Sequence, residues 1–263
     1  FYNGKIHDIR DKIAGLSNKI PSIKKVVVVP YVKAKADIGF IPHGVHLSDF
    51  IGGFKPCEIS FAQMPFDHPL YILYSSGTTG QPKCIVHESG GILLKHAVEQ
   101  AVQFSVGRDS RVFWFTTLGW MMWNWLVSAL ATGCTITLYD GSPFHPKPDV
   151  LFDLVDQESI TVFGISAKFL SNAHKEMVSP VKSHQLNSLR CLISTGSPLT
   201  EEGFEYVYQK IKQEVHLVSM TGGTDLISCF ILGNPNLPVY SGAVSYTHLR
   251  AHETPEHLGC RHL

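Results

Sequence analysis

The sequence has no excess of charge of either sign. Lys and Arg together number 22, Asp and Glu also number 22, and charged residues make up 17% of the 263 residues. Proteins that bind nucleic acids or anionic membrane surfaces through bulk charge carry a basic excess. We therefore expect neither kind of partner.

Closely spaced cysteine pairs are also missing. The chain has six cysteines and no C-x-x-C motif. In a chain of this length, scattered cysteines fit reduced thiols better than a disulfide framework, which favours a cytosolic location. The sequence begins at Phe1, without an initial methionine or a signal-peptide pattern. We therefore expect the natural protein to continue upstream.

Long, uninterrupted apolar runs are scarce. Residues 120–138 lack charged side chains, but Asn124, Gly133 and several hydroxyl residues interrupt them, and the aromatic residues gather at one end. A buried helix followed by a strand at residues 135–139 explains this pattern better than a bilayer span does. We expect no membrane span.

Apolar strand patterns alternate with helical patterns along the chain. Strands are expected at residues 26–29, 111–115, 135–139, 160–163, 189–194 and 215–219. Helices are expected at residues 6–20, 91–104, from 120 onward, 150–158, 166–174 and 201–212, with a surface connection at 38–64. Such alternation predicts an α/β fold with parallel-rich sheets covered by helices.

The segment richest in chemistry is residues 74–83, Tyr-Ser-Ser-Gly-Thr-Thr-Gly-Gln-Pro-Lys, which follows an apolar run at 70–73 that predicts a buried strand. Glycines let backbone N–H groups approach an anion, hydroxyls donate to phosphate oxygens, and lysine adds positive charge. The glycine spacing differs from that of a Walker A loop. A surface turn is the alternative; we favour a phosphate-binding loop made of Ser75, Ser76, Gly77, Thr78, Thr79, Gly80 and Lys83.

This segment resembles the signature loop of the adenylate-forming enzymes, which include acyl-CoA synthetases, luciferases and peptide-synthetase adenylation domains. The resemblance implies that the chain is part of the large N-terminal domain of such an enzyme. It also implies ATP-dependent conversion of a carboxylate into an acyl-adenylate, with release of pyrophosphate and later transfer of the acyl group to a thiol.

Two further segments follow expected strands and resemble motifs of the same superfamily. Residues 195–199, Thr-Gly-Ser-Pro-Leu, resemble its Gly-x-Pro segment, and residues 220–225, Met-Thr-Gly-Gly-Thr-Asp, resemble its aromatic-Gly-x-Thr-Glu motif. The carboxyl ends of strands are where α/β sheets bind ligands. The resemblance implies contacts with adenine and AMP by Gly196, Ser197, Pro198 and Thr224.

The same motif implies that Asp225 is a magnesium ligand, although most members of the superfamily carry Glu there and an aromatic residue leads the motif. An Asp can ligate a hard cation, but its shorter side chain requires a closer backbone or a bridging water. A simple turn is the alternative for this segment on its own.

Residues 115–123 resemble the segment that lines the acyl pocket in the superfamily. The resemblance implies substrate contacts by Trp120, Met121, Met122, Thr195 and Gly222. Gly222 lies where acetate-activating members carry Trp, which favours a pocket for more than two carbons. The implied reactants are acetoacetate, ATP and CoA, with Mg²⁺. The alternatives are another short or branched carboxylate, an amino acid, or a truncated ATP-binding fragment without activity.

The resemblance covers residues 1–240, which we interpret as a partial N-terminal AMP-binding domain. Residues 241–263 hold four of the 14 histidines, but without the H-E-x-x-H spacing of a zinc site, so we expect a non-native tail without function. The smaller C-terminal domain, which carries the lysine of the adenylation step in the superfamily, is absent from this sequence. No catalytic residue is therefore assigned, and we expect the chain alone to have little activity.

Several isolated polar residues are given ordinary structural roles. His87, His96 and His174 have no partnered acid or nucleophile in the sequence, so we expect them to be solvated or satisfied in the core. Ser197 is not in a G-x-S-x-G motif, and spacing alone assembles no Ser-His-Asp set.

Overall fold

The computed structural model describes residues 1–75 and 80–244, and the chain divides into two compact units, Phe1–Gln63 and Met64–Leu263. The first unit contains two helices and a parallel pair of strands: α1 (Arg10–Lys19), β1 (Val26–Val28), β2 (Gly44–His46) and α2 (Leu47–Ile51). The helix expected at 6–20 begins only at Arg10, where the Asp8 carboxylate accepts hydrogen bonds from the Arg10 backbone and side chain. The connection expected at 38–64 contains β2 and α2.

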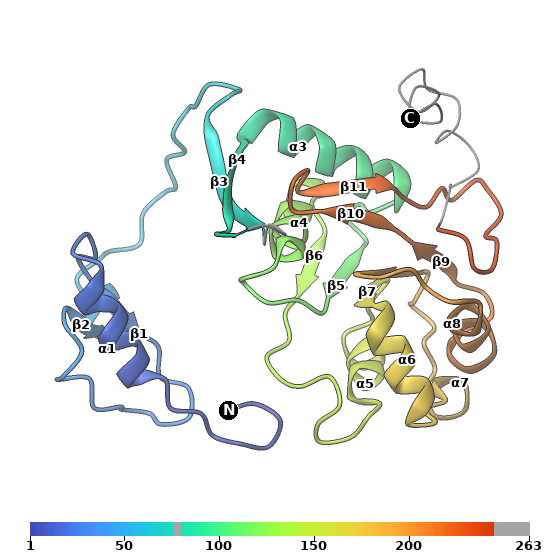
Figure 1. Cartoon of the computed structure of the whole chain (residues 1–263), viewed down its shortest axis with the longest axis horizontal. Helices are drawn as coiled ribbons and strands as arrows, with labels where there is room; N and C mark the ends of the chain where they lie inside the picture. The colour runs from blue at the N-terminus through green and yellow to red at the C-terminus, as the bar shows by residue number, and fades with distance from the viewer. Residues whose placement is uncertain (76–79, 245–263) are drawn as a thin grey trace. The chain divides into compact units, whose positions relative to one another are not determined.

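A five-stranded parallel sheet forms the centre of the second unit (Figure 1). Its strands, in spatial order, are β6 (Thr135–Thr137), β5 (Arg111–Trp114), β7 (Val162–Ser166), β8 (Cys191–Thr195) and β9 (His216–Ser219). Every neighbouring pair is parallel. The predicted α/β fold with a parallel sheet is confirmed.

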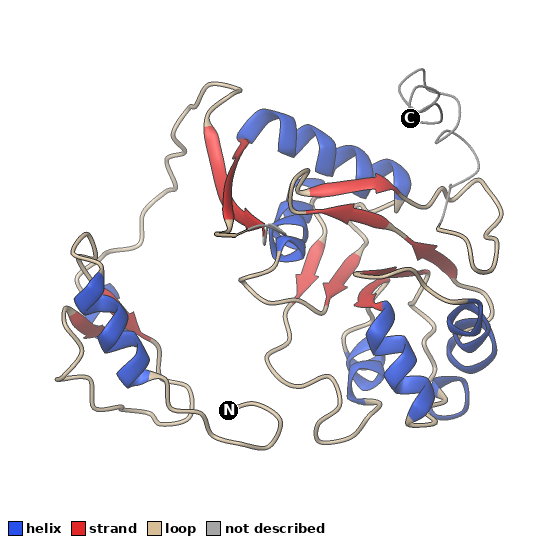
Figure 2. Cartoon of the chain, in the orientation of Figure 1, coloured by secondary structure: helices blue, strands red, loops and turns tan. Residues whose placement is uncertain are grey.

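Both faces of this sheet are buried along β5, β7, β8 and β9, because successive side chains of these strands enter different core clusters. Phe113 of β5 packs with α5 (Val150–Gln157), α6 (Ala167–Lys175) and α8 (Glu201–Tyr206), whereas its neighbours Val112 and Trp114 pack with α4 (Met121–Ser128). Figure 2 shows helices on both sides of the sheet. The helices are α4 (Met121–Ser128), α5 (Val150–Gln157), α6 (Ala167–Lys175), α7 (Pro180–Ser183) and α8 (Glu201–Tyr206).

Local sequence explains how these helices begin and end. The Ser166 hydroxyl accepts a hydrogen bond from the Phe169 amide at the start of α6, and Thr200 accepts one from the Gly203 amide at the start of α8. A 3-10 turn, η2 (Ala129–Thr132), extends α4, and a π-helical turn, η3 (Val207–Ile211), extends α8. Among the described residues, no helix is both long and apolar enough to cross a bilayer.

Two antiparallel hairpins accompany the sheet: β3 (Pro69–Ser75) with β4 (Lys83–Glu88), and β10 (Thr221–Gly223) with β11 (Ser228–Ile231). The strand predicted at 70–73 is present as part of β3, but the prediction that it is buried is wrong, because β3 belongs to a two-stranded sheet and Ile72 is 59% exposed. Helix α3 (Ser89–Val98) follows β4 and continues into a π-helical turn, η1 (Glu99–Gln103).

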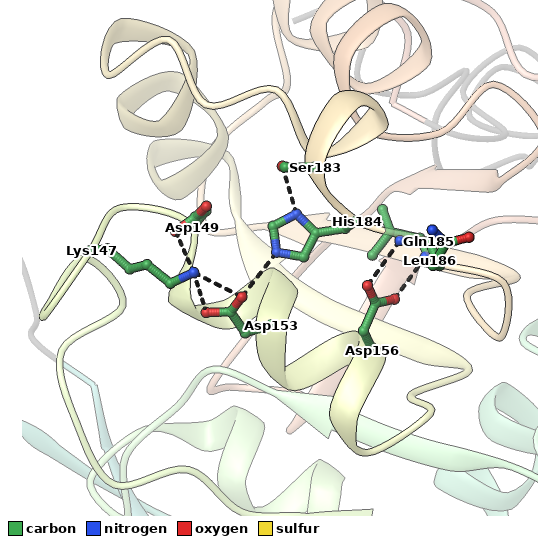
Figure 3. A network of polar contacts seen from close by, with 8 residues as sticks. All are labelled: Lys147, Asp149, Asp153, Asp156, Ser183, His184, Gln185 and Leu186. Carbon is green, nitrogen blue, oxygen red and sulfur yellow. Dashed lines mark hydrogen bonds and ion pairs between the residues drawn. The ribbon is translucent and has the colours of Figure 1, made fainter.

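A network of hydrogen bonds and ion pairs joins α5 to the segment before it and to the segment after α7 (Figure 3). Asp153 accepts hydrogen bonds from Lys147 and pairs with His184, while Asp156 accepts the backbone amides of Gln185 and Leu186. Partial burial of Asp153 opposes its ionisation, but the hydrogen bonds from Lys147 and His184 outweigh it and lower the pKa of Asp153. The network ties the segments before α5 and after α7 to α5.

This network also brings together a serine, a histidine and an aspartate, a set that spacing alone did not predict. Ser183 Oγ lies 2.8 Å from His184 Nδ1, and His184 Nε2 lies 3.2 Å from Asp153 Oδ1. Lys147 occupies the same carboxylate, with Nζ 2.8 Å from Asp153 Oδ2. These contacts hold α5 against its neighbouring segments, which explains why the three residues lie together.

Candidate functional site

A cleft of about 650 Å³ lies at the carboxyl ends of the parallel strands. It is lined by the ends of β5, β7 and β8, the segment after β9, the start of α4 and the tip of β3. This is the edge where parallel α/β sheets bind ligands, because the loops that follow the strands converge there.

The cleft brings together all the residues predicted to contact adenine, AMP or the acyl group. They come from three segments far apart in the sequence: Trp120, Met121, Met122, Thr195, Gly196, Ser197, Pro198, Gly222 and Thr224. The Thr195 hydroxyl donates to the Met220 carbonyl at 3.2 Å, which joins the turn after β8 to the turn after β9.

Gly196 has a backbone conformation that favours glycine. Its φ is +89°, in the left-handed region, where other residues are strained. The chain therefore turns sharply at the end of β8, and both Ser197 and Pro198 line the cleft.

The predicted phosphate loop is only partly described. Ser76, Gly77, Thr78 and Thr79 lie outside the described residues. Ser75 and Lys83 are paired partners at the ends of β3 and β4, so the hairpin brings the two ends of the loop together. Ser75, Gly80 and Lys83 are not among the lining residues, but Tyr74, next to Ser75, does line the cleft.

Among the described lining residues of the cleft there is no Asp, Glu, Lys, Arg or His. The polar groups that line it are hydroxyls and backbone, contributed by Tyr74, Ser166, Thr195, Ser197, Thr221, Thr224 and Ser228. Such a lining can position a reactant by hydrogen bonds but supplies no general acid or base at neutral pH. Charged groups must act from outside the lining.

Asp225 is exposed and lies directly after Thr224, which lines the cleft. No group of three or more His, Cys, Asp or Glu side chains that could hold a metal occurs in the part of the chain that the structure describes. Mg²⁺ is usually bound by one or two carboxylates together with substrate phosphates and water. A single carboxylate beside the cleft therefore fits magnesium bound together with ATP, and does not fit a metal held by protein alone.

Gly222 is fixed by close packing of two backbones. A Cβ on Gly222 would lie 2.0 Å from the Ser228 carbonyl oxygen and 2.7 Å from the Cys229 Cα, and the strand register shifts between Thr221 and Gly222. Hairpin β10–β11 therefore requires glycine here, a reason that sequence comparison with acetate-activating enzymes did not reveal. The deeper acyl pocket inferred from Gly222 stays a prediction.

The sequence reasoning missed several lining residues. Ser166 is the last residue of β7 and lies at the same sheet edge as the predicted turns, so the strand-end rule could have identified it. Ser228 and Cys229 belong to β11. Two glycines before an apolar run at residues 226–231 are a hairpin signal that could have predicted this strand. Burial raises the pKa of Cys229 to about 12, so its thiol stays protonated at neutral pH.

The histidines singled out in the sequence do not line the cleft. His87 and His96 are buried and hydrogen-bonded, as expected for histidines satisfied in the core. His174 stacks on Tyr206, with ring centroids 4.9 Å apart.

The comparisons with known proteins agree with this arrangement. Residues 18–248 match the model of the family described as AMP-binding enzyme, and the chain belongs to that family. It is 49% identical to an acetoacetyl-coenzyme A synthetase of Rhizobium meliloti over 93% of this chain and 37% of the relative. It is 46% identical to an acetoacetyl-CoA synthetase of Gallus gallus, over 94% of this chain and 38% of the relative.

A solved structure gives the same result. The acetoacetyl-CoA synthetase from Streptomyces lividans superposes with a TM-score of 0.85 at 38% sequence identity, covering 93% of this chain and 37% of that one. The α/β fold is therefore that of part of an acyl-CoA synthetase. The chain spans little more than a third of the length of these relatives.

Proposed function

We propose that this chain forms the ATP- and carboxylate-binding part of an acid–thiol ligase that converts acetoacetate, ATP and CoA into acetoacetyl-CoA, AMP and pyrophosphate. The observation that carries the proposal is the cleft, in which three separate motif segments line one space without charged side chains. The identity to acetoacetyl-CoA synthetases favours acetoacetate as the carboxylate. We also propose a cytosolic location, which agrees with the free thiols of the five cysteines that the structure describes.

The proposed chemistry follows from the lining of the cleft. A carboxylate oxygen attacks the α-phosphorus of ATP and pyrophosphate leaves; the thiol of CoA then attacks the acyl carbon and AMP leaves. The chain contributes hydroxyl and backbone groups that orient the reactants, and positioning is the main source of rate enhancement in such transfers. Where apolar side chains surround the reacting atoms, hydrogen bonds to the developing charge are stronger than they are in water.

Charge is supplied from beside the cleft. Lys83, at the start of β4, would hold the β- and γ-phosphates together with the signature loop, and Asp225 would hold magnesium. The metal would neutralise phosphate charge when bound. No side chain of the described cleft lining can act as the lysine of the family, so we expect full turnover to need a segment beyond these residues.

Pyrophosphate exchange into ATP tests the carboxylate. The full-length natural protein that contains residues 1–240 is assayed with acetoacetate, acetate, butyrate and a set of amino acids. We expect the highest kcat/KM with acetoacetate. A clear preference for any other acid would refute the proposed substrate while leaving the adenylation chemistry intact.

Calorimetric titration with ATP tests the proposed role of Lys83. We expect Lys83→Ala to weaken ATP binding by at least about tenfold, because it removes a charge-assisted contact with phosphate. Lys83→Arg, which keeps the charge, should lose less, and Lys147→Ala, which removes an exposed lysine of the α5 network, should bind as the unchanged protein does. Equal affinity of Lys83→Ala and the unchanged protein would exclude Lys83 from the ATP site.

A further inference from the structure

Three side chains from one short stretch hold the turn between β10 and β11. His87 Nε2 lies 2.9 Å from the Thr224 carbonyl oxygen, and His96 Nε2 lies 2.6 Å from the Ile227 carbonyl oxygen. The Ser228 hydroxyl donates to Glu99 Oε1. In Figure 1, α3, which carries His96, runs beside β11. We call His87, His96 and Glu99 the turn support.

The turn support is itself buried and is held in place by further contacts. Glu99 is fully buried; its Oε2 accepts the Trp125 indole N–H at 2.9 Å, and Lys95 Nζ lies 3.3 Å from its Oε1. A buried carboxylate is costly unless it is paired and hydrogen-bonded, and Glu99 has both kinds of contact.

His96 is also held at both ring nitrogens. Its Nδ1 lies 2.8 Å from the Ser128 hydroxyl of α4, on the side away from the turn. Burial lowers the pKa of His96, so the ring is neutral at pH 7. A neutral imidazole has one donor nitrogen, and the Ile227 carbonyl accepts only, so Nε2 carries the proton. The ring therefore has one stable orientation.

We propose that His87, His96 and Glu99 are positioning residues that set the place of Thr224 and Asp225, the residues assigned to AMP and magnesium. This inference rests on the proposed function of the cleft. Two of the three contacts fix backbone carbonyls on either side of Asp225, at Thr224 and Ile227. An aspartate has a short side chain, so the place of its backbone decides whether its carboxylate reaches a metal bound to ATP.

The location of the turn support gives it a second consequence. β4 begins at Lys83, the last residue of the signature loop, and leads through His87 into α3 and η1. One continuous segment therefore carries both the end of the phosphate loop and the contacts that hold the metal turn. The two sets of ligands for ATP are fixed relative to each other by that segment.

His87 allows a test that separates positioning from simple packing. The amide nitrogen of Gln reaches about as far as His Nε2, whereas that of Asn reaches only as far as Nδ1. His87→Gln can therefore keep the hydrogen bond to the Thr224 carbonyl, and His87→Asn cannot. His174→Asn is the matched control, because His174 packs on Tyr206 and does not line the cleft.

The variants are made in the natural gene product and assayed for pyrophosphate exchange over a range of Mg²⁺ concentrations. We expect His87→Asn to raise the half-saturating Mg²⁺ concentration roughly tenfold, the effect of losing about one hydrogen bond, with the KM for the carboxylate within about twofold of the unchanged protein. His87→Gln should restore the Mg²⁺ dependence to within about twofold, and His174→Asn should leave it unchanged.

Amide hydrogen exchange gives a readout that does not depend on catalysis. We expect peptides covering residues 221–231 to exchange faster in His87→Asn than in His87→Gln. If His87→Asn does not fold, Ser228→Ala removes the hydroxyl that meets Glu99 and should raise the half-saturating Mg²⁺ concentration in the same way.

Two results would overturn the inference. One is an unchanged Mg²⁺ dependence in both His87→Asn and Ser228→Ala; the other is equal losses in His87→Asn and His87→Gln. Failure of the proposed function would look different, because the unchanged protein would then show no exchange with any carboxylate. If it exchanges with a carboxylate other than acetoacetate, that acid is used and the comparison of variants still decides.

Discussion

The parallel sheet and the β3–β4 hairpin of the second unit differ in how far their side chains are buried. Three successive residues of β5, Val112, Phe113 and Trp114, are at most 4% exposed, whereas Ile72 and Tyr74 of β3 are 59% and 66% exposed. The segments that resemble phosphate and metal motifs lie in or beside the hairpins, at residues 74–83 and 220–225. We therefore expect the sheet to contribute more to stability than the exposed β3–β4 hairpin, while that hairpin and the β10–β11 turn hold most of the residues proposed to bind ATP.

The substitution for which we expect the greatest loss of stability lies in the parallel sheet, at Phe163. Phe163 of β7 is fully buried, stacks on Phe113 with ring centroids 5.4 Å apart, and contacts Phe152 and Phe169. We expect Phe163→Ala to lower the free energy of unfolding by about 3–5 kcal/mol, because it removes apolar contacts and leaves a cavity. Denaturant unfolding monitored by circular dichroism measures this.

The β3–β4 hairpin provides the control for this prediction. Ile72→Ala, at a position 59% exposed, should change the free energy of unfolding by less than about 1 kcal/mol. A comparable loss of unfolding free energy in the two variants would mean that β3 contributes to the core as much as β7 does. The contrast between the sheet and the β3–β4 hairpin would then not hold.

We expect an intermediate loss of stability at Gly222, one of two adjacent glycines in β10. Gly222→Ala places a methyl group 2.0 Å from the Ser228 carbonyl oxygen, whereas at Gly223 the nearest atom is Asp225 Oδ2 at 3.9 Å. We expect Gly222→Ala to lower the free energy of unfolding by about 1–3 kcal/mol and also to reduce pyrophosphate exchange, since the hairpin must shift.

Gly223→Ala is the matched control at the adjacent position. It should cost no more than about 1 kcal/mol and keep most of the exchange activity. If both variants lose activity equally, close packing against β11 is not what makes glycine necessary at 222. Thermal unfolding and the exchange assay, measured on the same samples, separate the two cases.

We expect a weaker effect from pH, which changes the free energy of unfolding through His96, where α3 contacts the β10–β11 hairpin. Burial holds the pKa of His96 below its ordinary value of 6.5 in the folded chain. The unfolded chain therefore takes up a proton first as the pH falls, so the stability that neutral His96 contributes is present above pH 6.5 and is lost as the pH falls through the folded-state pKa. The slope from one such group is at most about 1.4 kcal/mol per pH unit.

His96→Gln removes this titration and keeps an amide that can donate to the Ile227 carbonyl. The free energy of unfolding, measured from pH 7 to pH 5, should fall less steeply in this variant than in the unchanged protein. His216, whose pKa is also lowered by burial, supplies a second titration in the same direction, so some slope should remain. Identical slopes in the two proteins would show that His96 does not couple proton binding to folding.

Much of the sheet could be predicted from the sequence because its strands are short apolar runs between helical patterns. The strand at residues 111–115 and the helix at 150–158 agree with β5 and α5 within one residue at their ends. The exposure of β3 could not be predicted in the same way, since the run at 70–73 is as apolar as a buried strand and only tertiary pairing leaves it exposed. Local pattern does not report which partner a strand finds.

The same limit applies to the site. The motif segments at 195–198 and 222–224 lie in one cleft because they follow parallel strands, which strand order alone explains. The contacts of His87 and His96 with Thr224 and Ile227 join residues that no spacing rule connects. They could be found only from the folded chain.

The turn support also bears on the order in which the second unit folds. Its contacts span 137 residues between His87 and Thr224, and 129 between Glu99 and Ser228. Pairings that close such long loops form late, because the chain loses much entropy before the contact is made. β5 and β7 can pair before β9 exists, but the support cannot form completely until residues 224–228 have been synthesised. A nascent chain would therefore pair the first strands of its sheet before it completes the proposed ATP site.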